Sequence, residues 1–342
     1  ARSLDAACGP SGEAWPRPGV VAGLRQGLFE LKRPPGKGDW LNNTGVVDRK
    51  GQTLAEWCEQ APRKPQAGDV IRLVRLGGSE LGVLDTAWLA DCIRCFFFGV
   101  SVEVLEPIPR EEVLRRVAHQ EGSGAGVQLL TQDVHKYLQA SNGPDGARRV
   151  FATVGATELD LCPGGYVPWV YGQANPRTGT CVFSVARYQP QYIDAVHMRL
   201  RMVRTLCHEL SHAFGLRHCI WYECIMAGSA GDWESDMQPL HLCPVCLAKL
   251  DVALGGMDLA GREASLSAFW QASGEEGEAE WSQRRLQAIA QEEALGSFSC
   301  QPCLSEASGS DLLTPAVAKV QRRRSAAAAA AAAKALAAEA AE

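Results

Sequence analysis

Residues 205–219 read T-L-C-H-E-L-S-H-A-F-G-L-R-H-C. The apolar pattern around them predicts a helix over 196–214. Positions i and i+4 lie on the same face of a helix, so His208 and His212 can bind one metal ion. Glu209 lies beside the first histidine, where its carboxylate can reach a water bound to that ion. The stretch therefore predicts a metal site built on one helix.

A third ligand requires the helix to end and the chain to turn back. Gly215 can end the helix in the left-handed conformation at little steric cost, and His218 follows three residues later. Three neutral imidazoles leave the fourth position of a tetrahedral zinc for water, which is typical of catalytic zinc. A core helix whose histidines bond to backbone carbonyls is the alternative interpretation.

Four cysteines follow in two close pairs, Cys219 with Cys224 and Cys243 with Cys246. Four thiolates at such spacings are typical of a closed structural zinc site. Two disulfides or buried thiols are the alternatives. We therefore expect two Zn²⁺ ions per chain, one at the histidines and one at the cysteines.

The region before the motif alternates between apolar runs and helical patterns. Short branched runs predict strands at 70–76, 100–105 and 150–159, and apolar residues at helical spacing predict helices at 85–98 and 128–138. This alternation predicts an α/β layer with a mostly parallel sheet.

Three further segments complete the expected elements. The runs 167–173 and 180–186 read as two strands joined by a turn cluster, and 270–289 reads as an amphipathic helix. An ordinary buried hairpin is one interpretation of the two strands.

Composition narrows the class of protein. The chain has 342 residues, a net charge of -5 and 13 cysteines, with 46% hydrophobic residues. Nothing predicts a nucleic-acid surface, and no apolar run approaches the ~20 residues of a membrane span. The first 30 residues show no signal peptide. We expect a cytoplasmic location, with a nuclear one also open, where reduced thiols can bind zinc. The oligomeric state stays open.

The full pattern is H-E-x-x-H-x-x-G-x-x-H-C-x-x-x-x-C-x-M, followed by C-P-x-C. It resembles the archaemetzincins, a family of zinc metallopeptidases of the metzincin clan, and is closest to the vertebrate members. The resemblance covers roughly 69–254, through the segments 71–78, 95–109, 154–161, 169–174 and 183–188.

The resemblance implies a metzincin-like α/β (α+β) fold. Its sheet is mixed and mostly parallel, with an edge strand over the active-site helix, and a small zinc subdomain held by the four cysteines follows. Met226 is implied to form a turn beneath the catalytic ion. Peptides are implied to bind along the edge strand by strand addition, which makes Trp169, Val170, Tyr171 and Gly172 candidate substrate-binding residues.

The resemblance also implies peptide hydrolysis, often of the aminopeptidase type. In this hypothesis a zinc-activated water is deprotonated by Glu209 as the general base. The substrates are peptides or proteins. An aminopeptidase needs an acid to hold the free amine, and Glu158, Asp160 and Glu223 are candidates. The alternative is a zinc-stabilised peptide-binding module with little or no turnover.

Composition shifts predict three parts. Residues 1–62 form a Pro- and Gly-rich N-terminal extension, and 63–255 form the metzincin-like catalytic domain. The zinc-bound subdomain 219–250 lies within that domain. Residues 256–342 form a C-terminal extension that ends in an Ala-rich tail containing eight alanines at 326–333.

Overall fold

A computed structural model describes six stretches of the chain, residues 16–42, 50–77, 83–122, 126–141, 149–188 and 193–296. The predicted Ala-rich tail lies outside them. Up to Ala294, the described residues belong to one compact unit. Within this part of the chain, no helix combines the length and apolar character that crossing a membrane requires.

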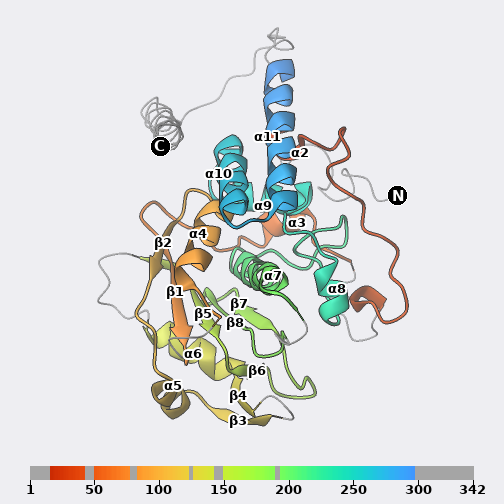
Figure 1. Ribbon diagram of the computed structural model, residues 1–342. Helices are drawn as coiled ribbons and strands as arrows, with labels where there is room; N and C mark the ends of the chain where they lie inside the picture. Colours follow the sequence, from red (N-terminus) through yellow and green to blue (C-terminus); the bar gives the residue numbers. More distant parts are fainter. Residues whose placement is uncertain are drawn as a thin grey trace. The chain divides into compact units, whose positions relative to one another are not determined.

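A five-stranded sheet forms the centre of the fold (Figure 1). Its strand order is β2 (Ser101–Val104), β1 (Val70–Leu76), β5 (Val150–Thr157), β8 (Thr180–Ser184), β7 (Gly172–Asn175). The first four strands are parallel, and β7 pairs antiparallel with β8 at the edge. The predicted mixed, mostly parallel sheet is confirmed. Strands β1 and β5 are buried along almost their whole length because both faces of the sheet are covered.

Helices cover the two faces of this sheet. α4 (Thr86–Phe96) and α7 (Ala195–Ala213) pack on one face, where α7 lies over β7 and β8 (Figure 1). α5 (Arg110–Arg116) and α6 (Thr131–Ser141) pack on the other. Alternate residues of β1 belong to different cores, with Leu73 in the first and Val74 in the second. Successive side chains of a strand point to opposite faces, so the sheet separates the interior into two layers.

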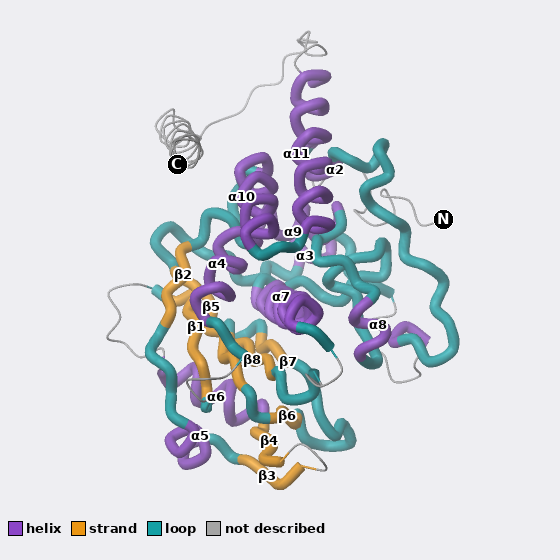
Figure 2. The backbone as a smooth tube through the Cα atoms, in the orientation of Figure 1, coloured by secondary structure: helices purple, strands orange, loops and turns teal. Residues whose placement is uncertain are grey.

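A second sheet was not predicted. It has the order β3 (His119–Gly122), β4 (Gly126–Leu130), β6 (Asp160–Cys162) and is drawn in Figure 2. The predicted helix at 128–138 was wrong at its start, because residues up to Leu130 belong to β4 and α6 begins at Thr131. Strand pairing decides the secondary structure of these residues, because Gln128 to Leu130 pair with β6.

Two other predictions need correction. The predicted helix at 270–289 is two helices, α10 (Leu259–Ala272) and α11 (Glu276–Gly296), because Gly274 turns the chain at φ 75°. The predicted strand at 167–173 is strand only from Gly172. The helix at 85–98 is confirmed as α4, and its predicted N-cap Asp85 accepts a hydrogen bond from the Trp88 amide at 3.0 Å.

The N-terminal and C-terminal parts pack on the central region. The short helices there are α2 (Pro18–Val21), η1 (Trp40–Asn42), α3 (Leu54–Glu59), α8 (Asp232–Asp236) and α9 (Pro244–Ala253). α2 and α3 contact α9, and α10 contacts α4. Arg17 also donates from Nε to Oδ2 of Asp251 at 2.7 Å. The boundaries at residues 62 and 255 stay predictions, since packing does not divide the described residues there.

Candidate active site

The helix that carries the motif, α7, begins and ends one residue before the predicted bounds of 196–214. Asp194 caps the first turn of α7 by accepting from the amide of His197 at 2.8 Å. After Ala213 the chain turns at Gly215, whose φ is 79°. A Cβ at that position would lie 2.5 Å from Cβ of Pro62. Glycine is therefore required for the conformation and for the close approach of another segment.

Residues from the N-terminal part hold this turn. The indole Nε1 of Trp57 donates to the carbonyl of Phe214 at 3.0 Å, and Nε2 of Gln52 donates to that of Gly215 at 3.2 Å. The amide of Arg217 donates back to Oε1 of Gln52 at 3.1 Å. These contacts satisfy carbonyls of the turn that follows the helix and direct the chain toward His218.

The three motif histidines converge. One ring nitrogen of each of His208, His212 and His218 lies within 4.8 Å of the others. Nδ1 of His208 contacts the Ile225 carbonyl at 2.8 Å, and Nδ1 of His212 contacts the Leu216 carbonyl at 2.6 Å. A carbonyl only accepts, so each Nδ1 carries the proton and each Nε2 presents a lone pair.

The two Nε2 atoms of His208 and His212 are 3.1 Å apart. Two lone pairs at that distance repel each other unless a cation lies between them. Burial, with the neighbouring His212 and His218, holds the pKa of His208 well below its ordinary value. The imidazole is then neutral, which is the form that binds a metal ion. The donor set fits zinc, and backbone carbonyls fix the orientation of two of the rings.

The four motif cysteines form a second, buried cluster. The sulfur atoms of Cys219, Cys224, Cys243 and Cys246 lie within 4.8 Å of one another, and all four are free thiols in the structure rather than disulfides. Cys224 accepts hydrogen bonds from the amides of Met226 at 3.5 Å and Cys243 at 3.2 Å. Such contacts favour a thiolate, and four sulfur donors with no open side fit a structural zinc.

One short turn connects the two clusters. The amide of Cys219 donates to the carbonyl of Met226 at 2.7 Å, and Met226 is fully buried. The neighbouring carbonyl of Ile225 accepts from His208. The same few residues thus orient a histidine and hold a cysteine. The position of Met226 beneath an ion stays a prediction.

His208 and His218 line a cleft with a cavity volume of ≈ 620 Å³. All four predicted substrate-binding residues line it, although only Gly172 belongs to strand β7 and the other three precede it. The lining also includes Val167 and Pro168, residues of the motif stretch 205–219, and the segment after the Met226 turn. The sequence did not indicate the remaining four residues, Trp40, Arg204, Ser235 and Gln238.

Glu209 lies against the edge strand. A Cβ added to Gly172 would lie 2.6 Å from Cγ and 2.9 Å from Oε1 of Glu209. Glycine at this position therefore allows the carboxylate to approach the strand. Burial raises the pKa of Glu209 to about 8, and a neighbouring cation would favour its charged form.

The three acids considered as amine-binding groups are paired with cations instead. Glu158 pairs with Arg75 at 3.1 Å, Asp160 with Arg187 at 2.6 Å, and Glu223 with Lys32 at 2.8 Å. None of them lines the cleft. Among the described residues that do, Glu209 is the one carboxylate.

Comparison with known proteins places these features in one family. Residues 151–252 match the model of Peptidase family M54. Archaemetzincin-2 of Mus musculus is 32% identical over 263 residues, which cover 68% of this chain and 72% of that protein. Archaemetzincin-2 of Homo sapiens is 33% identical over 197 residues, which cover 49% of this chain. The chain spans about half the length of that human relative, 53%.

Archaeal proteins are also similar. Archaemetzincin of Pyrococcus furiosus is 28% identical over 200 residues and is covered over 98% of its length. The crystal structure of archaemetzincin from Methanopyrus kandleri shares 24% sequence identity with a TM-score of 0.43, covering 55% of this chain and 97% of that one. Because the match to the mouse protein covers 72% of that protein at 32% identity, the chain belongs to the archaemetzincin family.

Proposed function

We propose that this chain is a zinc-dependent metallopeptidase. The observation that carries the proposal is the convergence of three histidine nitrogens, two of whose rings line the same cleft as Glu209. The family gives independent support, because the matching model describes peptidases.

His208, His212 and His218 would hold the zinc ion. When bound, zinc lowers the pKa of a water molecule toward ~7 and polarises a carbonyl group. Glu209 accepts the proton of the attacking water and passes it to the leaving amine. Gly172 keeps the carboxylate close to the edge strand, so the general base lies next to the backbone along which we expect a peptide to lie.

The edge strand supplies the peptide-binding surface. β7 is the last strand of the sheet and has a neighbour on one side only within the described residues. An extended peptide can pair with the other side through main-chain hydrogen bonds. Trp169, Val170 and Tyr171 precede this strand and line the cleft, where they can contact substrate side chains.

The second zinc is proposed to be structural. Cys219, Cys224, Cys243 and Cys246 would surround it completely, and a closed sulfur site contributes folding energy rather than chemistry. This gives two zinc ions per chain with different donors.

Aminopeptidase-type action is the finer form of the proposal and comes from the family resemblance alone. It is tested with peptides that differ only in a free or acetylated N-terminus. An aminopeptidase cleaves the free form and not the acetylated one.

The peptidase itself is tested on a mixed peptide library with the zinc-loaded wild type and Glu209→Gln. This variant keeps the size of the side chain and removes its basicity. We expect turnover to fall by ~10² to 10⁴ with zinc content and peptide affinity unchanged. A wild type that binds peptides but cleaves none supports the peptide-binding module. Equal cleavage by both proteins contradicts the role given to Glu209.

A further inference from the structure

A segment remote in sequence from the metal motif forms part of the cleft wall. We name residues 30–42 the N-terminal strap. Its residue Trp40 lines the cleft, and its ring centre lies 4.5 Å from that of His218 at an interplanar angle of 64°. The Pro- and Gly-rich sequence around it gave no indication of this role.

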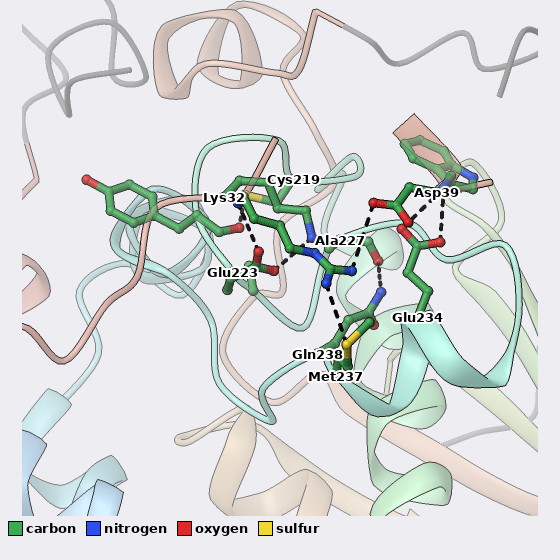
Figure 3. A network of polar contacts seen from close by, with 12 residues as sticks. Lys32, Asp39, Cys219, Glu223, Ala227, Glu234, Met237 and Gln238 are labelled. Atoms are coloured by element: carbon green, nitrogen blue, oxygen red, sulfur yellow. Dashed lines mark hydrogen bonds and ion pairs between the residues drawn. The ribbon is translucent and has the colours of Figure 1, made fainter. Parts of the chain in front are cut away.

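One end of the strap is anchored to the loop between the first two cluster cysteines. The amide of Lys32 donates to the carbonyl of Trp221 at 3.1 Å, and the amide of Glu223 donates to that of Glu30 at 2.9 Å. Lys32 and Glu223 also form an ion pair at 2.8 Å, and the amide of Arg33 donates to the same carboxylate at 3.0 Å (Figure 3). Main-chain and charged contacts thus hold the start of the strap.

A buried carboxylate anchors the other end. Glu234, only 3% exposed, accepts from the amide of Trp40 at 3.0 Å and from the amide of Ala230 at 2.7 Å. Asp39 closes the preceding turn by accepting from the amide of Gly36 at 2.8 Å. Glu234 therefore ties the strap to a segment that itself lines the cleft, and Figure 3 labels both Asp39 and Glu234 in this network.

The indole ring of Trp40 packs against a glycine, Gly228. A Cβ on Gly228 would lie 2.3 Å from Cδ2 of Trp40, so any larger residue there would displace the ring. Trp40 is half-buried and lines the cleft, and its main chain forms the bond to the anchor. An aromatic ring held this way is a rigid apolar contact surface at low entropic cost.

We propose that Trp40 is a specificity-determining residue that contacts the substrate residue next to the scissile bond and selects an apolar side chain there. Trp169 and Tyr171 supply the other aromatic surfaces of the same cleft. The cationic group in the lining, Arg204, donates from Nε to the Gln238 carbonyl at 3.1 Å and lies 3.7 Å from a carboxylate oxygen of Asp236. This inference rests on the proposed peptidase function.

The test compares Trp40→Ala and Trp40→Phe with a matched control, Trp233→Ala. Trp233 lies next to Glu234, is 50% exposed and does not line the cleft. The substrates are peptides identical except for Leu, Phe, Ala, Asp or Lys on one side of the cleaved bond. Zinc content is measured for every protein.

We expect Trp40→Ala to lower kcat/KM for the Leu and Phe peptides by about tenfold, mainly through KM, since a buried aromatic contact is lost. The Ala peptide should change by less than about twofold. Trp40→Phe should keep most of the preference, and Trp233→Ala should match wild type. Zinc content should be the same in all four proteins.

Two results overturn the inference. One is a folded, zinc-loaded Trp40→Ala that keeps the wild-type preference. The other is loss of zinc in Trp40→Ala, which makes Trp40 a support for His218 instead. If wild type cleaves no peptide, the peptidase proposal fails separately, and calorimetric binding of the same peptides decides. Tenfold weaker binding of the Leu peptide by Trp40→Ala than by wild type then supports the inference. Equal affinity of the two proteins for that peptide contradicts it.

Discussion

The histidine cluster and the cysteine cluster are consecutive in sequence, at His218 and Cys219, yet their surroundings differ. The histidines are partly exposed, and two of them line a cleft. All four cysteines are buried, and backbone amides point at the sulfur of Cys224. Both clusters fit a metal ion, but a substrate can reach only the histidines. Accessibility therefore distinguishes a catalytic metal site from a structural one.

The two clusters also depend on each other unequally. The turn that holds Cys224 presents the Ile225 carbonyl to His208, and the amide of Cys219 follows directly after His218. Disturbing the cysteines should therefore loosen the histidines, whereas removing a histidine should leave the cysteines in place. The following variants test the roles of the two clusters and of residues near them, from the largest expected effect to the smallest.

His212→Ala should abolish hydrolysis, with a loss of at least ~10⁴ in kcat, because the zinc that supplies the nucleophile is lost. Peptide cleavage and zinc content are measured together. The control is His197→Ala, which removes an exposed histidine at the start of the same helix. Wild-type cleavage by His212→Ala contradicts the assignment of this ligand.

Cys246→Ala should lower the free energy of unfolding by several kcal/mol, on the order of 3, because a closed zinc site contributes directly to folding. Thermal unfolding of the zinc-loaded protein measures it. Cys58→Ala is the control, since Cys58 is an exposed free thiol outside both clusters. Equal melting temperatures for the two variants would contradict a structural role for the cysteine cluster.

Gly172→Ala should lower kcat by about tenfold while both zinc ions remain, since the added methyl group pushes on the side chain of Glu209. Steady-state kinetics with a zinc assay measures it. Gly277→Ala serves as the control because its Cβ would meet nothing within 4 Å. Loss of zinc from Gly172→Ala would mean that this strand supports the ligands rather than the base.

A histidine outside both clusters should give the smallest effect. His135 is buried and contacts Oγ1 of Thr180 at 2.9 Å, and burial lowers its pKa below the ordinary 6.5. The unfolded chain then binds a proton that the folded chain does not. Stability should be complete above pH ~6.5 and should fall as the pH drops below it, by at most about 1.4 kcal/mol per pH unit.

The measurement is urea unfolding across that pH range for wild type and His135→Gln. The variant should show a shallower slope than wild type. Because acid also releases zinc, the difference between the proteins is the informative quantity. Identical slopes for wild type and His135→Gln contradict the prediction.

The sequence predicted best what is encoded locally. His208, His212, His218 and the four cysteines lie within 39 positions of one another, so helix periodicity and ligand spacing suffice to group them. Strand β1 was predicted at its observed bounds because a branched run ends at glycines.

Contacts between distant segments could not be predicted. Gln52 and Trp57 contact the end of the motif helix through backbone carbonyls, which no residue type reveals. Trp40 is held by a bond from its amide to the carboxylate of Glu234, which lies 194 positions away in the sequence. The start of α6 was misplaced for a related reason. Leu129 and Leu130 fit a helix or a strand, and pairing with β6 decides between them.

The most direct test of two distinct zinc sites is X-ray absorption with metal analysis on wild type and His212→Ala. Wild type should contain two zinc ions per chain, with nitrogen or oxygen and sulfur ligands together. His212→Ala should retain one zinc with sulfur ligands alone, at ~2.3 Å. A remaining zinc that still shows nitrogen ligands, or the loss of both ions, would contradict the account.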